Sequence, residues 1–187
     1  GVVVSQSSRI GGDELDEAVV QFMKKEHGLT IGSRSAEEIK MALGSAVPLV
    51  DEVRAEGRGR DLVSGLPRKL VISSSEVREA IVEPVASIVD TVKSTLDRTP
   101  PELAADIMEN GIVLAGGGAL LVGLRELVEA ETGMPVRLAP DPHIAVVLGA
   151  GRALEEFDLY GELILSDGFE WPMAAQRSAD RPRPTLL

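Results

Sequence analysis

The chain of 187 residues contains no cysteine, which excludes disulfide bonds and thiolate metal sites. Aromatic residues make up only 3%, so a core must be built from aliphatic side chains. Basic residues are also scarce: 19 Lys and Arg stand against 30 Asp and Glu, a formal charge of −11. A field of that sign repels nucleic acid and anionic lipid headgroups, so we expect no nucleic-acid partner. Phosphate binding stays open, because backbone N–H groups at helix starts hold anions without a basic patch.

Long apolar runs are missing as well. No stretch approaches the roughly 18 apolar residues that a membrane-spanning helix needs. No basic segment followed by an apolar one marks a secretory signal. We therefore expect a cytoplasmic protein. The chain starts at Gly1 without an initiator Met, so we also expect it to be a piece of a longer protein.

What is present favours a folded protein. Hydrophobic residues make up 44% and the mean hydropathy is +0.10, enough for a sizeable core. Val2, Val3 and Val4 predict a buried strand. Asp13 is the expected N-cap of the helix that follows, whose inward face carries Leu15, Val19 and Phe22 and whose stop signal is Gly28.

Two Ser-x-x-Glu patterns predict further helix starts. Ser35 with Glu38 would open a short helix, and Ser73 with Glu76 would open the longest helix of the chain. Pro84 interrupts the latter and should kink it.

The rest of the chain alternates between strands and helices. Residues 47–72 are strand-like, with a hairpin turn at 64–67. Beyond the longest helix, the pattern predicts a helix at 102–110, a buried strand at 112–115 followed by a glycine turn and an amphipathic helix, a strand at 136–138 and a helix at 145–154.

This alternation predicts an α/β or an α+β fold, with the hairpin region of residues 47–72 in a small inserted lobe. The pattern weakens after about residue 155, so the tail of residues 157–187, which holds the only Trp at position 171, is expected to be partly ordered at most.

Five segments carry a family signature together. They are Ile-Gly-Gly-Asp-Glu-Leu-Asp-Glu-Ala (10–18), Ser-Ala-Glu-Glu-Ile-Lys (35–40), Gly-Arg-Asp-Leu-Val with Gly-Leu-Pro (59–67), Val-Lys-Ser-Thr-Leu with Thr-Pro-Pro-Glu-Leu-Ala-Ala-Asp-Ile (92–107), and Leu-Ala-Gly-Gly-Gly-Ala-Leu-Leu (114–121). Each is weak alone, but in this order they resemble the MreB/Mbl family of bacterial actin-like, cell-shape-determining proteins. The resemblance runs from residue 1 to about residue 155 and fails over the tail.

This resemblance implies an α/β fold, the ribonuclease-H-like second lobe of an actin-like ATPase, with an inserted α+β subdomain. The core subdomain would comprise residues 1–11 and 85–156, and the insert residues 12–84. In that family ATP or ADP lies between two lobes, and this half would supply the adenosine side of the cleft. The nucleotide contacts that the resemblance implies are Gly12, Glu37, Glu38, Ile39, Lys40, Gly116, Gly117, Gly118, Ala119 and Leu120.

Each implied contact has a chemical rationale and a purely structural alternative. Glycines let a backbone pass close to the sugar and α-phosphate, but they also simply form strand-to-helix turns. A carboxylate such as Glu37 accepts hydrogen bonds from ribose hydroxyls, and the stem of Lys40 covers a base. Taken without the family, these two residues form an ordinary solvated pair on one helical face. Gly12 equally suits a turn, and Glu38 a capping box.

Other parts of the family's cleft have no counterpart in this sequence. The two phosphate loops, with the Mg²⁺-organising Asp and the acidic residue that positions water, precede Gly1 in family order. Phosphoryl transfer depends on positioning and charge neutralisation of the γ-phosphate, so we expect no ATP hydrolysis by this chain alone. No catalytic or metal-binding residue is assigned, His143 included, and Mg²⁺ is expected only with the complete cleft.

The function implied by the resemblance is that of an MreB-type cytoskeletal protein. Such a protein binds ATP or ADP, polymerises on the cytoplasmic face of the membrane and determines rod cell shape by organising cell-wall synthesis. The implied partners are further copies or a full-length relative, and the cell-wall elongation machinery. The membrane-inserting segment belongs to the first lobe, so no direct membrane insertion is expected from this half. Exposed apolar faces should favour self-association.

Three alternatives differ in class. A non-enzymatic module could co-assemble with a full-length relative and regulate its filaments. A dinucleotide-binding enzyme would need Gly-x-Gly-x-x-Gly after a first strand, which neither Gly116-x-Gly118 nor Gly149-x-Gly151 completes. A chaperone-type ATPase shares the fold and the Glu37-x-x-Lys40 spacing, but its substrate-binding β domain is absent.

Overall fold

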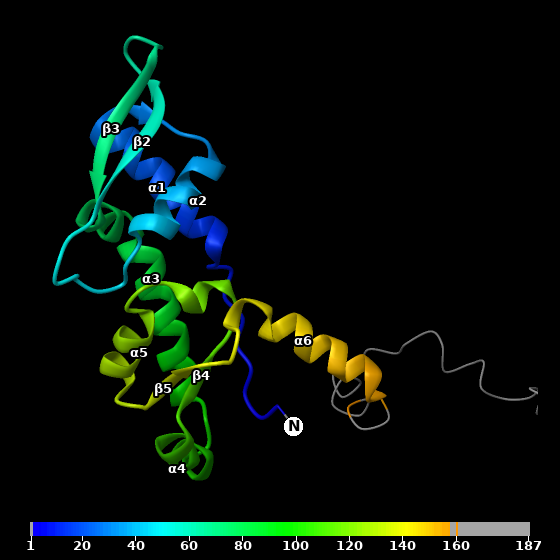
Figure 1. Ribbon diagram of the computed structural model, residues 1–187. Coiled ribbons are helices and arrows are strands. Elements are labelled where there is room, and N and C mark those ends of the chain that lie inside the picture. Colours follow the sequence, from blue (N-terminus) through cyan, green and yellow to red (C-terminus); the bar gives the residue numbers. More distant parts are fainter. Residues whose placement is uncertain (1, 158–159, 161–187) are drawn as a thin grey trace, which may run out of the picture.

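The computed structural model describes residues 2–157 and residue 160 (Figure 1). Its elements, in chain order, are α1 (Gly12–His27), β1 (Leu29–Thr30), α2 (Ser33–Leu43), β2 (Arg54–Asp61), β3 (Pro67–Ser73), α3 (Ser74–Asp97), α4 (Pro101–Asn110), β4 (Ile112–Leu114), the short 3-10 helix η1 (Gly117–Leu120), α5 (Leu124–Thr132), β5 (Val136–Leu138) and α6 (Pro142–Glu155).

Two separate sheets lie along the long helix α3 (Figure 1). The first is antiparallel in the order β1-β2-β3, with Gly57 opposite Leu70. The second pairs β4 and β5 in parallel, with Ile112 opposite Val136. α1 and α2 pack beside the first sheet and α5 beside the second, so α3 contacts both groups of elements. The mixed strands and helices confirm the predicted α/β class.

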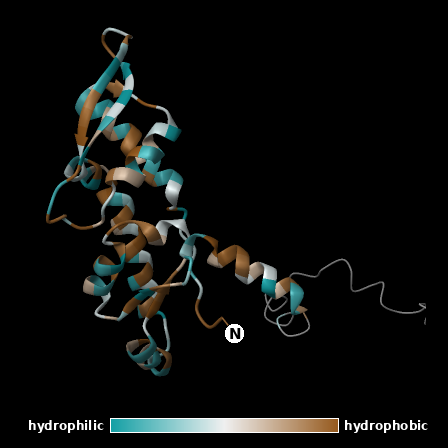
Figure 2. Ribbon diagram, in the orientation of Figure 1, coloured by the Kyte–Doolittle hydropathy of each residue, from teal (hydrophilic) through white to brown (hydrophobic). Residues whose placement is uncertain are grey.

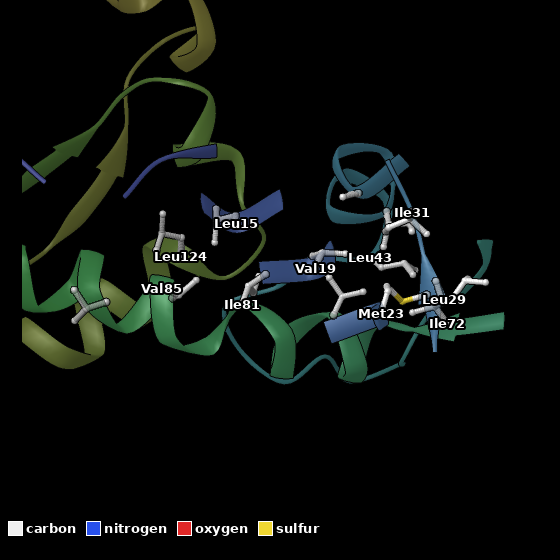
Figure 3. Packing of buried hydrophobic residues seen from close by; sticks show 14 of the residues in the cluster. Leu15, Val19, Met23, Leu29, Ile31, Leu43, Ile72, Ile81, Val85 and Leu124 are labelled. Atoms are coloured by element: carbon white, nitrogen blue, oxygen red, sulfur yellow. The ribbon is translucent and has the colours of Figure 1, made fainter. Parts of the chain in front are cut away.

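A continuous aliphatic core joins these elements (Figure 3). Along α3, residues Val77, Ile81, Val85 and Val89 recur every four positions and are almost fully buried, because one helical face turns inward at that spacing. The inward face of α1 contains Leu15 and Val19, as predicted, but Met23 in place of Phe22.

Helix boundaries confirm some local signals. Ser73 caps α3: its hydroxyl oxygen accepts from the Glu76 N–H, and the Glu76 carboxylate accepts from the Ser73 N–H at 2.8 Å. Gly28 ends α1 in the left-handed region, at φ 60°. The N-cap of α1 is Gly11, however, and Asp13 lies inside the first turn, where a carboxylate favours the helix dipole.

The predicted capping box of α2 is wrong. The helix begins three residues earlier than expected, at Ser33 after the N-cap Gly32, so Ser35 is an interior helical residue. Glu38 instead accepts from Arg34 at 3.3 Å, one helical turn away. A capping pattern predicts a start only when the preceding residues leave the helix, and here they continue it.

The predicted strand at Val2–Val4 is also wrong. These residues are not in a strand, and Val2 and Val3 are 82% and 63% exposed. A strand needs a neighbour for its backbone hydrogen bonds, and the described residues provide none here. The strand at Ile112–Leu114 is only half buried, because within the described residues it pairs with β5 alone.

The hairpin forms close to its predicted place but not with the predicted bounds. Residues 47–53 are not in a strand, and Pro67 belongs to β3 and not to the turn. Asp61 accepts from the N–H groups of Val63 and Ser64 and so shapes the turn between β2 and β3, where Gly65 has φ 70°. α4 begins with Pro101, and α6 starts three residues before the predicted helix. The predictions for Trp171 and the tail fall mostly outside the described residues.

Candidate functional site

The glycine turn follows β4 along the chain and is hydrogen-bonded to the start of α6. The N–H of Gly116 donates to the Pro142 carbonyl at 2.6 Å, and the N–H of Ala119 donates back to the Gly116 carbonyl at 3.2 Å. Gly116 has φ +88°, a conformation that side chains rarely adopt, so its glycine is explained by the backbone. The turn then forms η1, and α5 begins only at Leu124.

Gly117 and Gly118 have no such backbone explanation. Neither has a positive φ, and a Cβ added to either would meet no other atom of the described chain within 4 Å. A larger side chain would therefore fit at either position. Neither packing nor conformation within the described chain therefore requires these two glycines, and their open face is free for close approach by a ligand.

Ala119 and Leu120 differ in exposure. Ala119 is buried, whereas Leu120 is 53% exposed. Both line a cavity of about 430 Å³, together with residues that include Arg137 and Leu138 of β5.

Lys40 lies against the start of α1. Its ammonium nitrogen is 2.8 Å from a carboxylate oxygen of Asp16 and donates to the Gly12 carbonyl at 3.1 Å. The Lys40 and Asp16 side chains are only 15% and 12% exposed. The structure thus brings two predicted site residues, Gly12 and Lys40, into contact, and it adds Asp16, which sequence reasoning missed.

The other residues of the α2 motif point in different directions. Glu37 and Glu38 are exposed. Ile39 is 8% exposed and belongs to the hydrophobic core, where it faces Gly57 of β2. The side chain of Ile39 therefore stabilises the packing of α2 on the first sheet.

The end of α2 meets the segment that follows the glycine turn. Ser45 forms a parallel bridge with Val122, and the Ala46 N–H donates to the Val122 carbonyl at 2.7 Å. Gly44 fits between the two segments, because a Cβ there would lie 2.4 Å from the Lys40 carbonyl oxygen on one side and 3.2 Å from Leu121 Cδ1 on the other. The two predicted halves of the site, α2 and the glycine turn, are thus joined by direct backbone contacts.

An ion pair anchors the loop that makes this bridge. Arg78 of α3 contacts the Glu52 carboxylate at 2.7 Å and donates to the Ser45 hydroxyl at 3.2 Å. The hydrogen bond from Arg78, and then that from Ser74, lowers the pKa of Glu52 below its ordinary value. The loop is therefore fixed to α3 at both ends.

One signal in the sequence could have revealed Asp16. Asp16 lies on the inward face of α1, three positions before Val19 and seven before Met23. A carboxylate on a buried stripe requires a cationic or hydrogen-bonding partner, since burying an unpaired charge is costly. Which of the cations is the partner cannot be derived from the spacing within α1.

Other chemistry is sparse in the described part of the chain. His143 is exposed at the start of α6, and no three of its His, Asp and Glu residues gather as metal ligands would. Gly149 and Gly151 lie inside α6, as the sequence pattern indicated. Among the helices that the structure describes, none combines the length and the apolarity that crossing a membrane demands.

Solved structures define the class of protein. MreB5 of Spiroplasma citri bound to ADP superimposes with a TM-score of 0.80 at 34% identity, covering 90% of this chain and 50% of that one. The same protein bound to AMPPNP gives the same score and identity, covering 88% and 50%. A MamK double helical filament, at 22% identity and a TM-score of 0.65, shares the fold. The fold is that of an actin-like protein.

Sequence comparisons identify the family within the actin-like proteins. The family model described as MreB/Mbl protein matches residues 1–162. The cell shape-determining protein MreB of Escherichia coli K12 is 49% identical over 168 residues, covering 89% of this chain and 48% of that protein. Mbl of Bacillus subtilis is 43% identical over 157 residues, covering 84% and 47%. The chain belongs to the MreB/Mbl family, and it spans about half the length of these curated relatives.

Proposed function

We propose that this chain forms the adenosine side of an ATP/ADP site in an MreB-type cytoskeletal protein. The observation that carries the proposal is the open face of Gly117 and Gly118, next to a segment bonded to the end of α2. The solved MreB5 relative bound ADP and AMPPNP, which supports a nucleotide as the ligand. Mg²⁺ would accompany the nucleotide, without a ligand set among the described residues of this chain.

The residues fit an adenosine better than a polyphosphate. Gly117 and Gly118 leave room for sugar and α-phosphate, and Leu120 presents an exposed apolar surface to a base. Glu37 is exposed on the same helix as Lys40 and has a carboxylate for ribose hydroxyls. Glu38 pairs with Arg34 and Ile39 packs in the core, so these two would contribute by fixing the position of α2.

We also propose that the chain is divided into the two subdomains predicted from the sequence. Residues 12–84 contain the first sheet with α1 and α2, and residues 85–156 contain the second sheet with α4, α5 and α6. The two sheets share no strand, and α3 crosses between them. Gly11 and Gly12 would then form the hinge into the insert.

We further propose that the protein self-associates head to tail. The outer face of the hairpin at one end of the molecule carries Arg54, Arg58, Arg60 and Lys69 around the single carboxylate of Glu56. α4, at the other end (Figure 1), exposes Glu102, Asp106 and Glu109. Complementary charges on opposite ends favour a heterologous contact, which repeats as an open filament.

Charge reversal tests this assembly. Arg60→Glu and Asp106→Arg should each raise the critical concentration for assembly in sedimentation assays, and the double variant should recover part of the loss. Equal assembly of all four proteins at low salt would refute the head-to-tail contact.

Filaments of this kind would work in the cytoplasm at the membrane face, determine rod cell shape and organise cell-wall synthesis through the elongation machinery. The family names of the relatives support the role in cell shape. A second function, an interaction module that co-assembles with a full-length relative, is favoured by α6. This helix projects from the body and is largely apolar (Figure 2), with Val146, Val147 and Leu154 at least 65% exposed.

Calorimetric titration of the full chain with ADP tests the nucleotide proposal. We expect micromolar binding, and a loss of roughly tenfold or more in Gly118→Val, because a branched side chain would occupy the space left for the ligand. Gly149→Ala is the matched control, since that glycine also has open space around it but lies in α6. Absence of binding at millimolar ADP, or unchanged affinity of a folded Gly118→Val, would overturn the proposal.

A further inference from the structure

Asp16 is a charged residue in an apolar setting. Its neighbours on the inward face of α1 are Leu15, Val19 and Val20, and the residue itself is 8% exposed. A carboxylate in such a place is retained at a cost unless its partner compensates for the lost hydration. The compensating group is the ammonium of Lys40, at 2.8 Å.

The Lys40 ammonium is only partly used by the protein. It has three N–H donors, of which it gives one to the Gly12 carbonyl. The Asp16 oxygen at 2.8 Å forms an ion pair with the ammonium but has no hydrogen bond from the described residues. A third N–H has room for an acceptor from outside, because the side chain is still 15% exposed. Glu37 lies three positions earlier and hence on the neighbouring part of the same helical face.

Two contacts also restrict the direction of that third N–H. A free lysine side chain has four rotatable bonds and orders itself on a ligand at an entropic cost. Here the carboxylate and the carbonyl hold the ammonium before any ligand arrives. The carboxylate also neutralises the lysine charge, so the group offers an oriented donor and little net attraction for phosphate.

We propose that Asp16 is a positioning residue for the adenosine half-site, holding the Lys40 ammonium so that its free N–H meets an acceptor of the nucleoside. The inference rests on the proposed function and deepens it. The group recognised is the neutral nucleoside, so adenosine and ADP should depend on Asp16 to the same degree.

Asp16→Glu is the most informative variant. It retains the charge and the ion pair but lengthens the side chain by one methylene, which displaces the ammonium without leaving a buried charge unpaired. Asp16→Asn removes the charge, and Asp16→Asn with Lys40→Met removes both members. Asp61→Glu is the matched control, because it lengthens the carboxylate of the partly buried Arg68–Asp61 pair by one methylene in the same way, but at the hairpin turn and away from the half-site.

Titration calorimetry of the folded full-chain variants with adenosine and with ADP gives the readout. Asp16→Glu and Asp16→Asn should each weaken the binding of both ligands by about tenfold, and Asp61→Glu should leave both affinities unchanged. The double variant should bind no worse than Lys40→Met alone. If the unaltered chain binds but Asp16→Glu binds equally well, or if the Asp16 and Lys40 losses add, the positioning role is refuted while the proposed function stands. If the unaltered chain binds neither ligand, both are refuted.

Discussion

Gly59 of β2 lies close against β1 in the first sheet. A Cβ at this position would lie 2.5 Å from the carbonyl oxygen of Thr30, 2.8 Å from Leu29 Cγ and 2.9 Å from Ile31 Cγ2. One of these atoms belongs to the backbone, and Leu29 and Ile31 are 0% and 5% exposed. The added methyl group therefore cannot be accommodated by rotating the end of a side chain, and β1 must shift.

Gly57→Ala on the same strand is the matched comparison. Its Cβ would face the same side of the sheet but would meet one atom below 3 Å, Ile72 Cδ1 at 2.6 Å, the far end of a flexible side chain. In both variants the replacement of glycine by alanine raises the free energy of unfolding by about 0.5–1 kcal/mol, because alanine is more favourable than glycine inside a strand. Overpacking a core costs about 1–3 kcal/mol.

The two contributions predict different net effects. Gly59→Ala should have the higher packing cost and a net loss of about 1–2 kcal/mol, whereas Gly57→Ala should be within about 0.5 kcal/mol of the unaltered chain. Since β1 forms only two residue pairs with β2, its displacement adds to the loss at Gly59.

Urea unfolding followed by far-UV circular dichroism measures the difference. With a slope of roughly 2 kcal/mol per molar urea, the midpoint of Gly59→Ala should fall by about 0.5–1 M. Equal midpoints for the two variants, or a more stable Gly59→Ala, would refute the close packing of β1 against β2.

Three further results are expected. The pKa of Glu76 is lowered from its ordinary value of 4.5, first by the hydrogen bond from the Ser73 hydroxyl. The ionised Glu76 carboxylate therefore stabilises the fold fully above pH 4.5, and this contribution is lost as the pH falls through the lowered pKa. Glu76→Gln should thus flatten the acid side of the curve of unfolding free energy against pH, measured by urea unfolding. An unchanged curve would contradict the capping role. Ile81→Ala, in a side chain that is 0% exposed, should cost about 2–5 kcal/mol in the same assay, and a loss below about 1 kcal/mol would place Ile81 outside the core. Val147→Glu on α6 should reduce self-association in sedimentation velocity without changing the circular dichroism spectrum, and undiminished association would show that this face is not in contact.

Much of the fold could be predicted because its signals are local. Ser73 with Glu76 defines a helix start through bonds within four residues, and Gly28 ends a helix through its own left-handed conformation. Apolar residues every four positions along α3 identify its buried face. The family motifs added the order of these elements and the actin-like class, which the solved relatives confirm.

The errors occurred where a local signal depended on distant neighbours. Val2–Val4 has strand composition, but a strand forms only where another strand can pair with it. Ser35 and Glu38 have capping chemistry, yet the residues before them were free to extend the helix. All residues of the motif that contains Ile39 were predicted to contact the nucleotide. Successive residues of a helix point in different directions, however, and Ile39 is buried.

The amino-acid sequence by itself determined the class of the fold, most helix ends, the aliphatic faces and the family, because each depends on residue type at short spacing. The tertiary structure alone decided which residues of the site meet. Asp16 and Lys40 are 24 positions apart on different helices, and only the packing of α1 on α2 pairs them. Likewise, only the close approach of Ser45 to Val122 joins α2 to the glycine turn, because contacts between distant segments depend on the geometry of the whole core.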